Sequence, residues 1–84
     1  MKYRKKPVII DAILWNGTKE SLQEIYRLGD IDVIKYIATN NSLYIQSIEG
    51  LMSAKIGDWI VKGVKGELYP VAADIFPLTY EKAE

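Results

Sequence analysis

The first apolar stretch of the chain has the pattern of a β-strand that is covered on both sides. Residues 7–15 run Pro-Val-Ile-Ile-Asp-Ala-Ile-Leu-Trp. They begin with a proline and are rich in β-branched side chains, which predicts a strand that starts at Pro7. Alternate positions place apolar side chains on both faces, and only Asp11 interrupts one of them. A strand of this kind must be covered on both faces.

The next stretch has the spacing of an amphipathic helix. Residues 16–18 (Asn-Gly-Thr) predict a turn, and the hydroxyl of Thr18 suits the N-cap position. The apolar side chains that follow recur at helical spacing, at Leu22, Ile25 and Tyr26. Gly29 comes where helices often end. We therefore expect one main helix over residues 19–28.

Five shorter stretches of β-branched and aromatic residues follow, separated by turn residues. They predict strands over residues 31–38, 42–48, 51–55, 58–62 and 67–71. Asn40-Asn41 suits a hairpin turn because asparagine tolerates a positive φ, and a glycine at position 50 serves the next turn. Gly57-Asp58 predicts a bulge or a tight turn. The short loop between the last two strands, at residues 63–66, begins and ends with glycine.

The order of these elements predicts an α+β fold. We expect one domain over residues 1–84, in which a small curled antiparallel sheet of about five to six strands packs with one main helix and a short C-terminal helix. Asp74 is placed to cap this last helix, which would run through Tyr80 with Pro77 early in it. Because one helix cannot cover both faces of the sheet, we expect a second subunit to supply the missing layer. A homo-oligomer, most simply a symmetric dimer, would do so.

Composition restricts the chemistry that is open to the chain. Its 84 residues include 11 basic and 11 acidic side chains, so no overall field favours nucleic acid or an anionic membrane. No apolar run approaches the ~18 residues that span a bilayer, and no signal-peptide cleavage site follows the basic start. Cysteine and histidine are absent, which removes disulfides, soft metal ligands and the usual general base near neutral pH. We expect a cytoplasmic protein that is not an enzyme and carries no metal or cofactor.

Two groups of cations are candidates for anion binding. Arg4, Lys5 and Lys6 could hold a phosphate, but a solvated edge that prevents sheet pairing is the simpler explanation. In the loop near Lys65, backbone N–H groups and lysine side chains beside two glycines could meet an anion. This loop is no P-loop, because a strand and not a helix follows it. A hairpin turn with solubilising lysines is the simpler explanation here as well.

Aromatic and acidic residues are the other candidates. The chain has six tyrosines and one phenylalanine, and tyrosine is enriched at interfaces because its hydroxyl needs a partner when buried. Most of these rings are expected in the core or at a subunit interface, while some could stack on a nucleobase. Asp58 and Asp74 suit turn and cap positions, and Glu67 suits an ion pair with a lysine across its hairpin. Acid–base catalysis by these carboxylates is the weaker alternative.

The two ends of the chain resemble a family of small phage and prophage proteins. The N-terminal likeness consists of Lys5-Lys6-Pro7-Val8 and Trp15-Asn16-Gly17. The C-terminal likeness consists of Gly57-Asp58-Trp59, residues 62–67 (KGVKGE), Tyr69-Pro70, and residues 75–80 with their Ile-Phe and Thr-Tyr pairs. Residues 30–53 are not diagnostic, and Pro77 and Ala72-Ala73 depart from the family pattern. Much of the motif is turn glycine and core aromatic, so the resemblance implies a fold more directly than an activity.

By analogy, the resemblance implies a binding function. Small phage proteins of this size without catalytic side chains often act on host systems by binding, and one class of them sequesters the nucleotide signals of bacterial immunity. The chain is thus expected to be an anti-defence protein of the infected host's cytoplasm that holds a cyclic ADP-ribose isomer or a cyclic oligonucleotide without turnover. The expected ligand contacts are Arg4, Lys5, Lys6 and Lys65 with phosphates, and Trp15, Tyr69 and Tyr80 with base or ribose. The alternative is an interaction module that docks on and inhibits a host or phage protein through an apolar sheet face or an unpaired strand edge.

Overall fold

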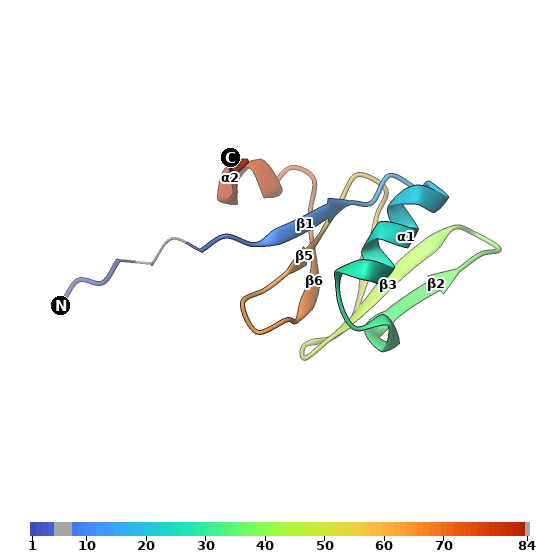
Figure 1. Ribbon diagram of the computed structural model, residues 1–84, viewed down its shortest axis with the longest axis horizontal. Helices are drawn as coiled ribbons and strands as arrows, with labels where there is room; N and C mark the ends of the chain where they lie inside the picture. Colours follow the sequence, from blue (N-terminus) through green and yellow to red (C-terminus); the bar gives the residue numbers. More distant parts are fainter. Residues whose placement is uncertain (5–7, 84) are drawn as a thin grey trace.

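Six antiparallel strands form two three-stranded sheets in the computed structural model, which describes residues 1–4 and 8–83. Sheet A has the order β1-β5-β6, with β1 at Asp11–Leu14, β5 at Trp59–Lys62 and β6 at Leu68–Val71. Sheet B has the order β2-β3-β4, with β2 at Ile34–Ile37, β3 at Ser42–Ser47 and β4 at Gly50–Ala54. The helical elements are α1 (Lys19–Leu28), the single 3₁₀ turn η1 (Ile31–Val33) and α2 (Phe76–Thr79) (Figure 1). The expected α+β class is confirmed, with the strands divided between two sheets.

Helix α1 begins and ends where the sequence predicts. The hydroxyl oxygen of Thr18 accepts a hydrogen bond from the N–H of Ser21 at 3.2 Å, which caps the N-terminus of the helix. Gly29 ends it with a φ of −163°, a conformation that any residue adopts. Its lack of a side chain matters for another reason, because a Cβ at this position would lie 3.0 Å from Cδ2 of Leu68. The end of α1 therefore lies directly against β6.

One face of sheet A forms the core together with α1 and sheet B. The register pairs Ile13 with Ile60, so both side chains lie on this face. The buried cluster takes residues from both sheets, from α1 and from the segment after β1: Trp15, Ile25, Ile34, Leu43, Ile45, Ala54, Ile60 and Leu68. The alternation of buried and exposed residues along β3 is that of a strand with one covered face. None of the helices in residues 1–4 and 8–83 combines the length and apolar character needed to cross a bilayer.

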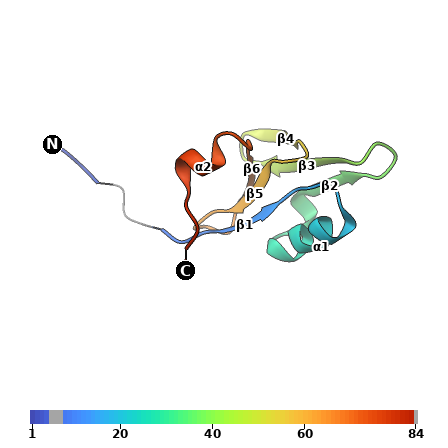
Figure 2. The same cartoon turned by 90° about the horizontal axis from the view of Figure 1, so that it is seen from above.

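The opposite face of sheet A is covered in part by the chain's own C-terminal segment. The register puts Ala12, Val61 and Tyr69 on this face. Figure 2 shows α1 and α2 on opposite sides of sheet A. Val61 is fully buried although it does not belong to the main core cluster. The expectation that a second subunit must cover this face is therefore wrong for the part that lies under α2, and a homo-oligomer stays a proposal.

Several predicted boundaries differ from the structure for local reasons. The first strand is confined to Asp11–Leu14, and Pro7, where it was expected to start, lies outside the described residues. Residues 31–33 form η1 instead of the start of a strand, because the Asp30 side chain accepts a hydrogen bond from the N–H of Asp32 at 2.9 Å. The expected cap by Asp74 is wrong, since α2 starts after Ile75 without a side-chain capping bond.

The β2–β3 hairpin is joined to the turn before α1 through Asn41. This residue has a φ of +53°, which confirms that its turn needs the left-handed conformation that asparagine tolerates. The Tyr36 hydroxyl donates a hydrogen bond to Oδ1 of Asn41. Nδ2 of Asn41 donates to the carbonyl oxygen of Gly17 at 3.1 Å. One side chain thus connects sheet B with the segment that leads from β1 into α1.

Candidate functional site

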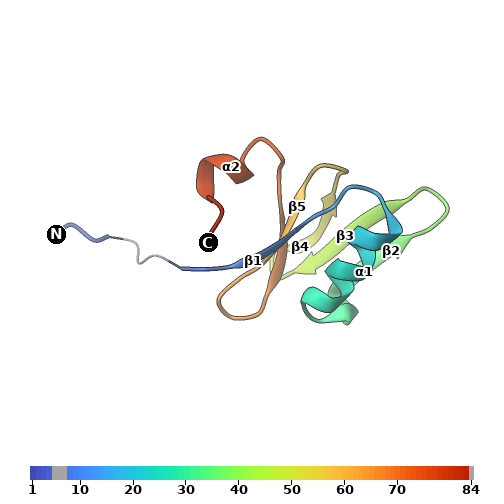
Figure 3. The same ribbon diagram turned by 45° about the horizontal axis from the view of Figure 1, so that its top comes forward.

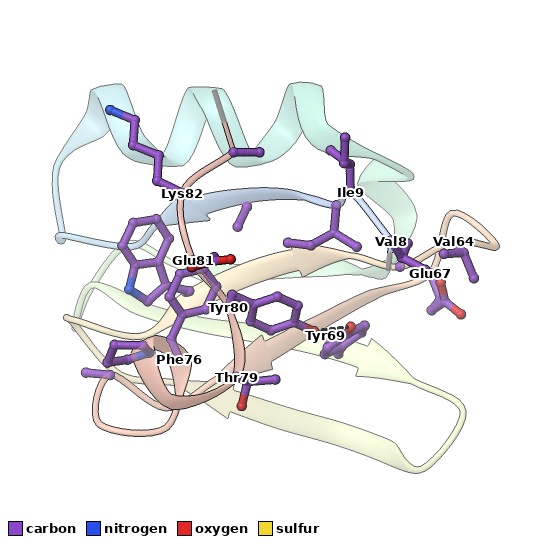
Figure 4. Close-up of a pocket in the computed structure, with 17 residues that line it drawn as sticks. Val8, Ile9, Val64, Glu67, Tyr69, Phe76, Thr79, Tyr80, Glu81 and Lys82 are labelled. Carbon is purple, nitrogen blue, oxygen red and sulfur yellow. Dashed lines mark hydrogen bonds between the residues drawn. The ribbon is translucent and has the colours of Figure 1, made fainter. Parts of the chain in front are cut away.

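The main candidate site is a groove of about 1330 Å³ on the α2 side of sheet A. Its floor comes from β5 and β6, and one wall comes from α2 and the residues after it. Figure 3 shows the chain returning from α2 toward β1, so that this C-terminal segment lies beside the start of the first strand. Val8 and Ile9 before β1, and Val64 in the β5–β6 turn, complete the lining (Figure 4). We call this hollow the aromatic groove.

Three aromatic rings form a row along the groove. Trp59 of β5 stacks on Phe76 of α2, with ring centroids 4.3 Å apart and planes at 8°. Phe76 also contacts Tyr80, at 5.1 Å between centroids and an interplanar angle of 32°. Offset and tilted ring pairs of this kind are each worth about 0.5–1.5 kcal/mol beyond the area that they bury. The row therefore fixes α2 on sheet A and gives the groove an aromatic wall.

Local hydrogen bonds place α2 so that its ring can reach Trp59. The N–H of Phe76 donates to the carbonyl oxygen of Ala72 at 2.9 Å, and the N–H of Tyr80 donates to that of Phe76, also at 2.9 Å. Pro77 stands at the start of the helix, where a missing N–H costs nothing. The N–H of Ala73 donates to Oδ1 of Asp58 at 3.3 Å, which ties the turn before α2 to the turn before β5.

Two tyrosine hydroxyls meet at the centre of the groove. The hydroxyl oxygens of Tyr69 on β6 and Tyr80 after α2 are 3.2 Å apart. Burial raises the pKa of Tyr69 to about 12, and the hydrogen bond with Tyr80 adds to this effect. Tyr69 is thus a neutral phenol at physiological pH. The pair offers a bound molecule one hydrogen-bond donor and several acceptor lone pairs in an otherwise apolar wall.

The charged side chains of the groove lie on its rim. Among the described residues that line it, Glu67 and Glu81 are acidic and Lys82 is the single cation. Among the described residues, Glu67 forms no ion pair with a lysine across its hairpin, which the sequence had led us to expect. Its Oε1 instead accepts a hydrogen bond from the backbone N–H of Lys65 at 3.1 Å. The described lining therefore carries a small excess of negative charge around an aromatic interior.

The structure brings together two of the residues that the sequence indicates for ligand binding. Tyr69 and Tyr80 share the aromatic groove. Lys65 is exposed and lines a second hollow of about 930 Å³ between the β5–β6 and β3–β4 turns. Arg4 is exposed in the N-terminal segment. Lys5 and Lys6 lie outside the described residues.

Trp15 has a different place from the one expected. It is 1% exposed and belongs to the core cluster, where its ring meets that of Tyr36 edge-on at 6.1 Å. This position leaves it no surface on which a ligand could stack, and the expectation that it contacts a base is wrong. The tryptophan that lines the groove is Trp59. Neither Trp59 nor Phe76 was among the ligand contacts expected from the sequence. Both faces of β5 carry large apolar side chains, Trp59 and Val61 on one and Ile60 on the other, so its alternation does not tell which face opens to a groove.

Three carboxylates, those of Asp30, Asp58 and Glu67, accept hydrogen bonds from the backbone. Oδ2 of Asp58 accepts from the N–H of Lys55 at 2.9 Å, and its Oδ1 accepts from Ala73, which confirms the expected turn role. Within residues 1–4 and 8–83, no three acidic side chains gather where they could hold a metal ion. The site thus consists of aromatic surface, two tyrosine hydroxyls and a charged rim. Comparison of the chain with protein-family models, with curated proteins and with solved structures gives no match.

Proposed function

We propose that this chain is a phage-derived anti-defence protein that binds and sequesters a nucleotide-type immune signal in the aromatic groove without turning it over. The observation that carries the proposal is the row Trp59, Phe76 and Tyr80 beside the paired hydroxyls of Tyr69 and Tyr80. A cyclic ADP-ribose isomer or a cyclic oligonucleotide has the matching chemistry, with flat bases and a ribose that carries hydroxyl groups. The proposed setting is the cytoplasm of the infected bacterial host.

Each part of such a ligand has a suitable partner in the groove. Stacking of a base on an aromatic side chain is worth about 1–3 kcal/mol. The hydroxyl pair of Tyr69 and Tyr80 can donate to a base edge or accept from a ribose hydroxyl. Lys82 on the rim can meet a phosphate. Specificity would come from the few polar groups, and most of the affinity from the rings.

The same groups favour binding over chemistry. A general base should have a pKa near the working pH, whereas burial raises the pKa of Tyr69 to about 12. The carboxylate of Asp58 already accepts two backbone hydrogen bonds through its two oxygens. Glu67 accepts one from Lys65. These interactions hold turns in place and support a role for the carboxylates in the scaffold.

The test is recovery of an intact ligand. The purified full chain is incubated with a panel of cyclic ADP-ribose isomers and cyclic di- and trinucleotides, and each compound is measured by chromatography before and after heat denaturation. Loss from the free pool followed by intact recovery on heating is the expected result. A new product would contradict the proposal and indicate an enzyme, and no loss of any compound would also contradict it.

Variants locate the binding to the groove. Tyr80→Phe removes one hydroxyl of the pair and keeps the ring, so we expect retained folding and about tenfold weaker binding, the effect of one lost hydrogen bond. Tyr44→Phe is the matched control, because Tyr44 lies on β3 and does not line the groove. Equal effects of the two variants would place the ligand elsewhere.

Docking on a protein is the second candidate function. It is favoured by the exposed apolar side chains Ile9 and Val64 on the groove rim, which are 83% and 73% exposed. A protein that buries this rim would lose its affinity on Val64→Asp. A nucleotide held by the ring row would be affected much less by this change. Parallel measurement of both kinds of binding on the Val64→Asp variant therefore separates the two functions.

A further inference from the structure

The N-terminal segment Met1–Arg4 combines positive charge with a large exposed ring. All four residues are exposed, and the side chains of Met1 and Tyr3 are 108% and 87% exposed. The hydroxyl of Tyr3 donates a hydrogen bond to the sulfur of Met1, at 3.6 Å. The cationic side chains of the segment are Lys2 and Arg4. In Figures 1 and 3 the N-terminal end of the chain extends away from its strands and helices.

The aromatic groove has acidic residues and aromatic rings that suit a basic segment. Its rim holds Glu67 and Glu81, with Lys82 as the one cation among the described lining residues. Its wall holds aromatic rings, on which arginine and lysine side chains pack favourably through cation–π contacts. The charges of segment and groove are therefore complementary. The volume of about 1330 Å³ exceeds what a drug-sized molecule fills and leaves room for a stretch of peptide.

The position of Val8 and Ile9 suggests how two copies would meet. Both residues line the groove, so the chain enters its folded body at the groove rim. In a dimer with a two-fold axis near this rim, each N-terminal segment starts beside the groove of the other copy, and the contact is made twice. The exposed side chain of Ile9 would be buried at the same interface.

We propose that the occupant of this rim is a second copy of the chain: in a symmetric dimer, Met1–Arg4 of one subunit lies against the aromatic groove of the other. Each groove then combines the ring row of one subunit with Lys2 and Arg4 of its partner. This composite site rests on the proposed function. Lys2 and Arg4 of the partner subunit would add positive charge beside the phosphates of a bound nucleotide, for which Lys82 is the one cation among the described lining residues. The contact between segment and groove itself needs no ligand.

A reciprocal charge exchange tests the contact. Arg4→Glu places like charges against the acidic rim, and Glu81→Lys places like charges against the basic segment. Each variant alone has two contacts between like charges in its dimer. We therefore expect the dissociation constant of the dimer to rise about tenfold or more. A mixture of the two variants restores both contacts, since the two exchanged charges attract each other on one side while the natural pair of Arg4 and Glu81 forms on the other. Light scattering and sedimentation of the full-length variants measure the masses without any ligand present.

Lys19→Glu is the control for the charge exchange. It changes an exposed cation on α1 that does not line the groove, and it should leave the dimer intact. A wild-type chain that stays monomeric at high concentration would overturn the proposal. So would a mixture of Arg4→Glu and Glu81→Lys that forms no heterodimer, which is also the result expected if each segment folds onto its own groove. Far-ultraviolet circular dichroism confirms that every variant is folded.

Ligand binding by the same proteins separates this inference from the proposed function. A dimer that forms as expected but retains no compound of the nucleotide panel supports the segment contact and contradicts the function. Full retention of a nucleotide by the monomeric Arg4→Glu variant contradicts the composite site and leaves the function standing. A loss of both dimer and retention in each variant, with recovery of both in the mixture, is the result that we expect.

Discussion

Replacement of Phe76 by alanine should release α2 from sheet A while the core stays folded. Helix α2 has four residues and no side-chain cap, and isolated helices shorter than ~12 residues are marginal in water. Its position therefore depends on tertiary contacts. Phe76 makes the two that are most evident, with Trp59 at 4.3 Å and Tyr80 at 5.1 Å between ring centroids.

The size of the effect follows from these contacts. Two aromatic pairs at about 0.5–1.5 kcal/mol each give about 1–3 kcal/mol. Loss of the apolar area of a half-buried phenylalanine adds about 1 kcal/mol. The free energy that holds the C-terminal segment closed should thus fall by about 2–4 kcal/mol. Because each 1.4 kcal/mol is a factor of ten, the amide protons of this segment should exchange about 30-fold faster or more.

Native-state hydrogen exchange measures this opening residue by residue. The amides of Phe76 and Tyr80 are suitable probes, since each donates a hydrogen bond of 2.9 Å within the segment. The amides of β3 should change far less, because Leu43 and Ile45 belong to the core on the other side of sheet A. Leu78→Ala is the control in the same helix. Leu78 is 82% exposed, and its removal should change the exchange free energies by no more than about 0.5 kcal/mol.

Two results would refute this reasoning. Unchanged exchange at residues 76–80 in Phe76→Ala would mean that the ring row does not hold α2 in place. An equal loss of protection in β3 would mean that the C-terminal segment and the core open as one unit. A smaller effect of Phe76→Leu than of Phe76→Ala would separate the contribution of apolar area from that of the aromatic ring.

Three further predictions concern the scaffold and its pH dependence, and the third comes with a test of its cause. Gly29→Ala should lower the free energy of unfolding in urea by about 1–3 kcal/mol, since the new methyl group would lie 3.0 Å from Cδ2 of buried Leu68. Asn41→Ala should cost about 1–3 kcal/mol in the same assay, because it loses two hydrogen bonds and keeps a φ of +53° that alanine disfavours. Tyr69, whose pKa is raised from 10.0 to about 12, stabilises the fold fully below pH 10.0, and this contribution is lost as the pH rises from there through about 12. After allowance for its partial exposure the loss is about 1–2 kcal/mol, visible as a falling melting temperature. Tyr80→Phe should move the tyrosinate absorbance titration of Tyr69 part of the way back toward pH 10.0, because it removes a secondary cause of the shift.

Each of these predictions has a result that would contradict it. A Gly29→Ala variant as stable as the wild type would mean that α1 and β6 separate at little cost. Asn41→Gly should be less harmful than Asn41→Ala, and the reverse order would remove backbone strain as a cause. A melting temperature that does not fall between pH 10 and 12 would show that Tyr69 ionises as easily in the folded chain as in the unfolded one.

Elements whose causes are local could be predicted from the residue pattern alone. The bounds of α1 follow from the Thr18 cap and from apolar residues at helical spacing, which act within a few residues of each other. The hairpin at Asn41 follows in the same way from the tolerance of asparagine for a positive φ. The α+β class follows from the order of helix and strand patterns. The strand predicted over residues 31–38 was too long. Its first residues have the apolar alternation of a strand, but the Asp30 side chain caps the turn η1 in the same stretch.

The choice of aromatic residues that line the groove depends on how the sheets and helices pack. Trp15 and Trp59 both adjoin apolar strands, but the packing of sheet A against α1 and sheet B buries the first and leaves the second facing α2. Tyr69 and Tyr80 lie eleven residues apart, and their hydroxyls meet because the chain turns back at α2 over the second face of the sheet. Local patterns carry no information on which of two apolar faces the rest of the chain will cover. That choice depends on the area buried by the whole fold, which no single segment contains.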